Sequence, residues 1–116
     1  MKTQIINDIS NQYGVEPEYL WPKTPDCCIF RHTSNRKWFA VIMKVAGNKL
    51  GLNTNQPQDI INVKCDAYLI STLCQSKGYF PAYHMNKQAW LSILLDGTVA
   101  KEEIIKLIDL SYELTR

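Results

Sequence analysis

Two groups of residues in this sequence carry side chains that could do chemistry, and the first lies within residues 78–103. His84, Lys87 and Asp96 could exchange protons, which requires groups within hydrogen-bonding reach of one another. Residues 90–95 alternate as a strand does, and six extended residues span roughly 20 Å. One strand therefore cannot bring Asp96 to His84. We expect Asp96 to lie in a turn and no catalytic residue to occur here.

The second group is basic. No acidic residue occurs between Cys27 and Gln58, a segment that carries Arg31, Arg36, Lys37, Lys44 and Lys49. A local field of one sign attracts phosphates or acidic partners even when the net charge is only +2. Cationic side chains at hairpin tips can contact a phosphate backbone without reading sequence. Two other interpretations stay open: an acidic protein partner, and a solvated face whose lysines prevent association of strand edges.

The four cysteines do not predict a metal site. Cys27, Cys28, Cys65 and Cys74 form no C-x-x-C pair, and Cys28 with His32 gives no closed site on a strand. Free cysteine behaves as a small buried hydrophobe. G-x-S-x-G, glycine-rich phosphate and H-E-x-x-H motifs are absent as well. The sequence therefore predicts reduced, buried thiols, no cofactor and no metal, and leans against an enzyme.

Length and composition predict one globular domain over residues 1–116. The chain is 46% hydrophobic and 21% charged, which is ordinary for a soluble protein. No apolar run approaches the ~20 residues of a membrane span. The N-terminal residues MKTQIINDIS lack the apolar centre of a signal peptide. We therefore expect a cytoplasmic protein with no membrane partner.

The first half of the chain predicts a helix followed by a sheet. Apolar residues recur at helical spacing over residues 2–13, and Gly14 is suited to end that helix. Residues 16–26 contain three prolines and predict an extended connector that Trp21 anchors to the core. Residues 27–32 and 37–45 predict a β-hairpin, and residues 49–53 and 59–65 two further strands.

The second half predicts two helices with a strand between them. Asp66 is a candidate N-cap for a helix over residues 67–77. Asp96-Gly97 marks the turn after the strand, and Thr98 is a candidate cap for a last helix with Ile104 and Ile108 on its buried face. This order predicts an α+β fold, an antiparallel meander with helices packed on one face of the sheet.

Several stretches resemble the MmcQ/YjbR family of small bacterial proteins. They are EPEYLWPKTPD, FRH at 30–32, KWFAVIMKV, LGL at 50–52 and PAYHMNKQAWLSILLDGTV. H-M-N-K-x-x-W at 84–90 followed by L-D-G at 95–97 is the most specific element, and the likeness covers residues 13–115. The resemblance implies a fold like that of CyaY, the bacterial frataxin, and a DNA-binding role through two wings. Frataxins hold iron on an acidic ridge, and Asp8 is the only acid of the first helix, so we expect no iron.

The sequence and the resemblance together predict a non-catalytic binding protein with DNA as its ligand. The expected contacts to nucleic acid are Arg31, Arg36, Lys37, Lys44, Lys49, His84 and Lys87. The alternative is a protein-interaction module, whose mark would be an exposed apolar patch around Trp21, Trp38 or Trp90. A small-molecule enzyme is the third reading, and it would need a pocket that joins His84 or His32 to a carboxylate.

Overall fold

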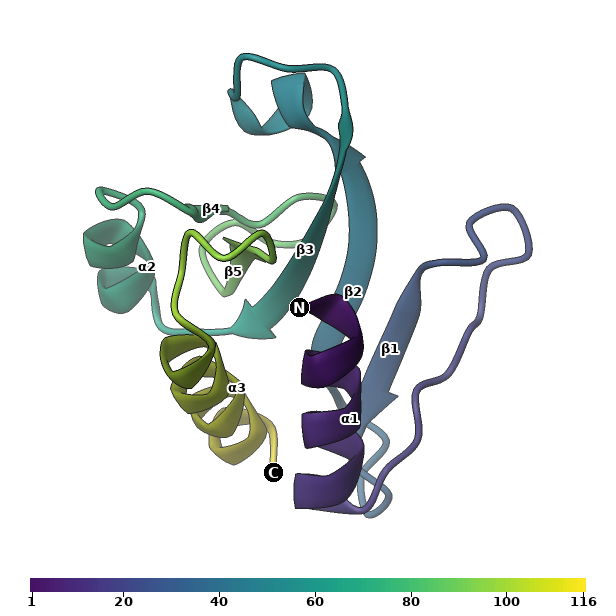
Figure 1. The fold of residues 1–116 in the computed structure, drawn as a ribbon. Coiled ribbons are helices and arrows are strands. Elements are labelled where there is room, and N and C mark those ends of the chain that lie inside the picture. The colour runs from purple at the N-terminus through teal and green to yellow at the C-terminus, as the bar shows by residue number, and fades with distance from the viewer.

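The computed structural model describes residues 1–116, which form an antiparallel sheet and a set of helices (Figure 1). In chain order the elements are α1 (Lys2–Tyr13), β1 (Cys28–Arg31), β2 (Trp38–Ala46), the 3-10 helix η1 (Gly47–Leu50), β3 (Pro57–Lys64), α2 (Ala67–Leu73), β4 (Tyr79–Pro81), β5 (Trp90–Leu94) and α3 (Lys101–Thr115). None of the helices has the length and apolar character that a membrane span requires.

The five strands lie in the order β1-β2-β3-β5-β4, and every neighbouring pair is antiparallel. The first three strands form the predicted meander. The chain then passes through α2 to the far edge, where β4 lies, and returns as β5 between β3 and β4. β4 is a strand that the sequence pattern did not predict, because three residues ending in Pro81 are too few to show alternation.

Helices α1 and α3 cover one face of the sheet. Ile5 and Ile9 of α1 and Ile104 and Ile108 of α3 are at most 1% exposed. Each such side chain contributes about 1.5–3 kcal/mol by its burial. They pack in one cluster with sheet residues Cys28, Phe30, Ala40, Ile42, Ile61, Val63, Leu91 and Ile93. The predicted α+β class is confirmed, while the likeness to CyaY stays a prediction.

Two predicted helix ends are confirmed at atomic detail. Gly14 follows α1 with φ 65°, a left-handed conformation that glycine adopts without steric cost, and its N–H donates to Ser10 O at 3.0 Å. Asp66 precedes α2, and its carboxylate accepts from Leu69 N at 2.9 Å. The helix predicted over residues 67–77 ends earlier, at Leu73. Cys74 N still donates to Ile70 O, four residues back, but Gln75 N and Ser76 N donate to groups three residues back, so the α-helix does not continue.

Two other predictions from the sequence are wrong. Residues 49–53 were expected to form a strand, but they lie in η1 and in the turn after it, where Gly51 has φ 83°. The hydrogen bond from Leu52 N to Gly47 O, 2.9 Å, closes this turn. Leu52 N is therefore not available for pairing with a neighbouring strand. Thr98 does not cap α3, which begins at Lys101 after Ala100. Instead its N–H donates to Asp96 Oδ1 at 2.9 Å and closes the predicted Asp96-Gly97 turn.

The end of α3 is tied to the sheet by buried hydroxyl groups. Ser111 Oγ donates to Phe39 O on β2 at 2.6 Å and accepts from Lys64 N on β3 at 2.8 Å. Thr115 Oγ1 lies 2.8 Å from His32 Nε2, at the turn between β1 and β2. Because the same hydroxyl donates to Ser111 O at 2.8 Å, the imidazole is the donor to Thr115. These bonds fix the β1–β2 turn beside the C-terminal end of α3 (Figure 1).

Candidate functional site

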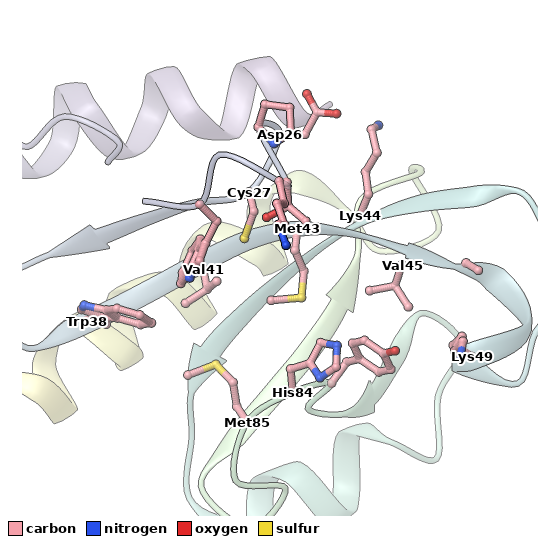
Figure 2. A pocket seen from close by; sticks show the side chains of 16 residues that line it. Asp26, Cys27, Trp38, Val41, Met43, Lys44, Val45, Lys49, His84 and Met85 are labelled. Atoms are coloured by element: carbon pink, nitrogen blue, oxygen red, sulfur yellow. The ribbon is translucent and has the colours of Figure 1, made fainter. Parts of the chain in front are cut away.

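A groove of about 620 Å³ lies on the face of the sheet that α1 and α3 leave uncovered. Its floor is β2, where Val41, Met43 and Val45 alternate with Ala40 and Ile42, which face the helices. Its volume falls in the range of known ligand pockets, roughly 300–1,000 Å³. The lining residues are Trp21, Lys23, Thr24, Pro25, Asp26, Cys27, Trp38, Val41, Met43, Lys44, Val45, Ala46, Lys49, Tyr83, His84 and Met85 (Figure 2).

One wall of the groove comes from the connector between α1 and β1. Glu18 pairs with Ile29 through two backbone hydrogen bonds of 2.9 Å, which attach the connector to the outer edge of β1. Trp21 then packs edge-to-face with Trp38 of β2, their ring centroids 5.9 Å apart and their planes at 84°. Trp21 therefore holds the connector to the sheet through Trp38, which packs against a buried cluster, while its own ring is 37% exposed and contributes an aromatic surface to the groove.

The opposite wall is the loop over residues 82–89, which a buried polar pair holds in place. Asn62 on β3 and Ser92 on β5 are both fully buried, and Ser92 Oγ donates to Asn62 Oδ1. Asn62 Nδ2 donates to Tyr83 O at 3.0 Å, and Tyr83 N donates to Ser92 Oγ at 3.0 Å. All of these buried groups therefore find partners, and the loop is fixed to the sheet at Tyr83.

His84 follows this anchor in a left-handed backbone conformation, with φ 62°. Such a conformation costs of order 1 kcal/mol for a residue with a side chain, and it is enriched at binding sites. The imidazole lies 4.0 Å from the Tyr83 ring, centroid to centroid, and it faces Met43 and Val45 across the groove (Figure 2). The loop thus directs an exposed imidazole at an apolar floor.

The charges at the groove are mostly positive. Lys23, Lys44 and Lys49 border it, with Asp26 as its one acid. Lys44 Nζ lies 2.9 Å from Asp59 Oδ1, a hydrogen bond that raises the pKa of Lys44. Its side chain points away from Met43 and Val45 (Figure 2). Lys23 and Lys49 make no ion pair, so they are the cations that a ligand in the groove could meet.

The seven residues predicted to contact nucleic acid do not gather in one place. Lys44, Lys49 and His84 border the groove. Arg36 and Lys37 are exposed in the β1–β2 turn, at the other end of β2 from η1 (Figure 1).

Besides Lys44, which pairs with Asp59, two more of the seven are engaged by the protein itself. The Nε and Nη2 atoms of Arg31 both donate to the Glu18 carboxylate at 2.8 Å, which lowers the pKa of Glu18. Lys87 Nζ donates to Ala82 O at 3.0 Å and closes the loop over residues 82–89.

The two histidines differ in what surrounds them. His32 is buried, 4.2 Å from the Tyr112 ring and hydrogen-bonded to Thr115, and no carboxylate accepts from it. His84 shares its groove with Asp26, but the two side chains lie on opposite sides of β2 (Figure 2). Asp96 lies in its predicted turn. No three His, Cys, Asp or Glu side chains come together in a way that could hold a metal ion.

Sequence reasoning missed most of the groove. Lys23 and Met85 carried no signal, because they belong to segments that only the tertiary fold brings together. The pairing of Arg31 with Glu18 and of Lys44 with Asp59 was missed for a related reason. Glu18 precedes the acid-free segment and Asp59 directly follows it, and Asp59 stands opposite Lys44 in the β2–β3 register.

Comparisons with known proteins agree with this fold. The sequence model of the YjbR family matches residues 10–114. The uncharacterized protein YyaQ of Bacillus subtilis (strain 168) is 39% identical over 115 residues, which are 99% of this chain and 98% of that protein.

Solved structures give the same result. A crystal structure of a Pseudomonas syringae protein is 38% identical, with a TM-score of 0.97 over 100% of this chain and 99% of that one. A crystal structure from Deinococcus radiodurans, 20% identical with a TM-score of 0.69 over 94% of this chain and 76% of its own, shares the fold. By its family match and by its identity to YyaQ over nearly the whole of both chains, this chain belongs to the YjbR family.

Proposed function

We propose that this chain is a non-catalytic binding protein for nucleic acid, with DNA as the ligand to test first, and that the groove is its contact surface. The observation that carries the proposal is the position of Lys23 and Lys49. Both are exposed cations without a carboxylate partner at the border of an apolar, aromatic groove. Phosphate contacts by lysine supply affinity, and rings beside them can pack against sugars and bases.

The predicted residues take different parts in this proposal. Lys49 and His84 stay in the contact set, and Lys23 joins them. Lys44 contributes less, because Asp59 already holds its ammonium group. Arg31 binds Glu18 and Lys87 binds Ala82 O, so both side chains stabilise the fold and are not available to a ligand. Arg36 and Lys37 could meet a ligand only if it also reached the opposite end of β2.

A pair of charge-matched variants tests the proposal. Lys23→Gln/Lys49→Gln removes two positive charges from the groove, and Arg36→Gln/Lys37→Gln removes two from the β1–β2 turn. Fluorescence anisotropy with labelled DNA at ~50 mM salt should show a loss of about tenfold or more for the groove variant and a much smaller loss for the turn variant. The slope of log affinity against log salt should fall by roughly two for the groove variant. Equal losses would mean that only net charge matters, and the groove assignment would be abandoned.

A second candidate function is protein interaction, and one observation favours it. Tyr19, Leu20 and Trp21 are consecutive and 57%, 41% and 37% exposed, so the connector presents an apolar surface beside the groove. A partner that binds there should be captured by the wild-type protein and lost with Tyr19→Ser/Leu20→Ser. Retention of the same partner by that variant would exclude the connector as its docking surface.

A further inference from the structure

We infer that the groove accepts unpaired bases, so that its ligand is a single strand of nucleic acid and not a duplex. The inference rests on the proposed function, because it names the form of nucleic acid that the same site takes. It follows from three features of the groove: its concave shape, its apolar and aromatic lining, and the separation of its cations.

Shape is the first argument. A protein that reads duplex DNA inserts a convex element, such as a helix or a two-stranded ribbon, into the major groove. Here the feature is a hollow of about 620 Å³ between the connector and the loop over residues 82–89. A hollow of this size accommodates groups that project from a strand. In a duplex the bases are stacked and paired inside, and nothing of that kind projects.

The lining is the second argument. Val41 and Met43 on the floor and Met85 on the opposite wall belong to one apolar cluster, and none of their side chains carries a strong hydrogen-bonding group. The outside of a duplex is sugar and phosphate, which would leave this surface without an apolar partner. The π-face of an unpaired base matches it, because bases stack on aromatic rings and thioethers pack favourably against ring systems.

The aromatic walls supply the stacking surfaces. Trp21 and Trp38 stand edge-to-face at 5.9 Å on one side, and neither ring is buried. Tyr83 and His84 stand 4.0 Å apart on the other side. Stacking on such rings is tolerant of sequence because every base has a π-face. The groove therefore suits a strand without demanding particular bases.

The cations are the third argument, and they favour a strand over a free nucleotide. Lys23 lies on the connector, whereas Lys49 lies in η1 beyond the end of β2. Both elements border the apolar floor, the connector along its wall and η1 where β2 ends. Cations on two different elements at the border of a base-binding floor suit successive phosphates of one chain, whereas a single nucleotide offers its phosphate at one position.

The experiment compares three ligands by fluorescence anisotropy at ~50 mM salt. They are a mixed-sequence strand of about 12 nucleotides, within the span that single-strand-binding domains cover, the same strand annealed to its complement, and a mononucleotide as competitor. We expect the strand to bind about tenfold or more tighter than the duplex. The mononucleotide should compete only at far higher concentration.

Matched tryptophan variants test whether the single strand binds in the groove. Trp38→Leu should weaken strand binding about tenfold, and Trp21→Leu, at an exposed position, should weaken it in the same direction. Trp90→Leu is the control, because Trp90 is also half-buried but lies outside the groove, beneath Lys64. Circular dichroism checks that each variant is folded. If Trp38→Leu does not fold, Trp21→Leu alone decides.

The outcomes separate the two proposals. Failure to bind either strand or duplex overturns nucleic-acid binding, and the inference with it. Duplex bound as tightly as the strand, with harmless tryptophan variants, overturns the inference and leaves nucleic-acid binding in place. Competition by the mononucleotide at the concentration of the strand would assign the groove to a free nucleotide and would also overturn it.

Discussion

The side chains of Asn62 and Ser92 hydrogen-bond to each other on the groove side of the sheet, at positions that face each other across β3 and β5. Both are fully buried, and together they hold the backbone of Tyr83 through one N–H and one carbonyl group. A polar pair inside an apolar sheet face is stable only while every member has a partner. Its position means that one wall of the groove depends on two residues that do not line it.

We predict that Asn62→Leu destabilises the protein by about 1–3 kcal/mol, because the buried Ser92 hydroxyl loses its acceptor and the partly buried Tyr83 O loses its donor. Urea unfolding measures the change. Gln58→Leu, an amide on the partly exposed end of the same strand, should shift stability by no more than about 0.5 kcal/mol. Hydrogen exchange at Tyr83 N should accelerate in Asn62→Leu. An unchanged exchange rate there would show that the loop is held by something other than this pair.

The stability of the fold should depend on pH through His32. Burial lowers the pKa of this imidazole, whereas in the unfolded chain it has the ordinary value of about 6.5. The unfolded state therefore binds a proton first as the pH falls. We expect the free energy of unfolding to be greatest above about pH 6.5 and to decrease as the pH falls from there toward the lower folded pKa.

Urea unfolding at several pH values between about 5.5 and 7.5 measures this dependence, in a window above the ordinary titration of carboxyl groups. His32→Gln should be less stable at high pH, because it loses the contacts to Tyr112 and Thr115, and its stability should vary less with pH. His84→Gln is the control, at an exposed position. A wild-type curve that is flat across the window would contradict the assignment.

Two glycines with nearly the same positive φ should respond differently to alanine. Gly78 has φ 91° and Gly97 has φ 94°, so both substitutions place a side chain where the left-handed region costs about 1–2 kcal/mol. A Cβ at Gly78 would also lie 2.6 Å from Val99 Cγ2, whereas a Cβ at Gly97 meets nothing within 4 Å.

We therefore expect Gly78→Ala to be more destabilising than Gly97→Ala by about 1–3 kcal/mol, the cost of overpacking. Thermal or urea unfolding of the two variants gives the difference directly, because the backbone contribution is shared. Equal losses would mean that Val99 moves aside without cost.

The four thiols should react slowly and in a defined order. Cys27, Cys28 and Cys65 are buried, as predicted, whereas Cys74 is half-buried. Burial raises the pKa of all four, to about 11 for Cys28 and Cys65, so the nucleophilic thiolate is scarce at neutral pH. Alkylation of the native protein followed by mass spectrometry should find Cys74 modified first. Modification of Cys28 ahead of Cys74 would contradict this order.

Local chemistry was enough to predict several elements of the fold. The isoleucine spacing and Gly14 predicted α1 to the residue, and the Asp66 cap predicted the start of α2. The aromatic and β-branched runs predicted β1 and β2. In each case the residues that decide the structure lie within one turn or one strand of each other. The strand prediction for residues 49–53 failed because Gly51 adopts a positive φ in a turn there. The alternation of apolar and polar residues does not reveal such a turn.

The groove could not be predicted in the same way, because no segment contains it. Its floor is in β2, one wall precedes β1, and the other wall follows β4. Nor does the sequence reveal that Glu18 binds Arg31 across a backbone bridge. The net charge of a sequence segment therefore overstated the number of cations without an acidic partner. The pairing between neighbouring strands and segments decides which cations stay unpaired.

The hydroxyl groups of Ser111 and Thr115 make the completion of the fold depend on the last helix of the chain to be synthesised. The chain emerges from the ribosome N-terminus first, and its early strands are made long before α3. Until α3 has been made, Phe39 O, Lys64 N and His32 lack the partners that this helix supplies, and the inner face of the sheet lacks the cover of Ile104, Leu107 and Ile108. A nascent chain that lacks α3 therefore leaves apolar side chains of the sheet without their cover, and such surface is prone to aggregation.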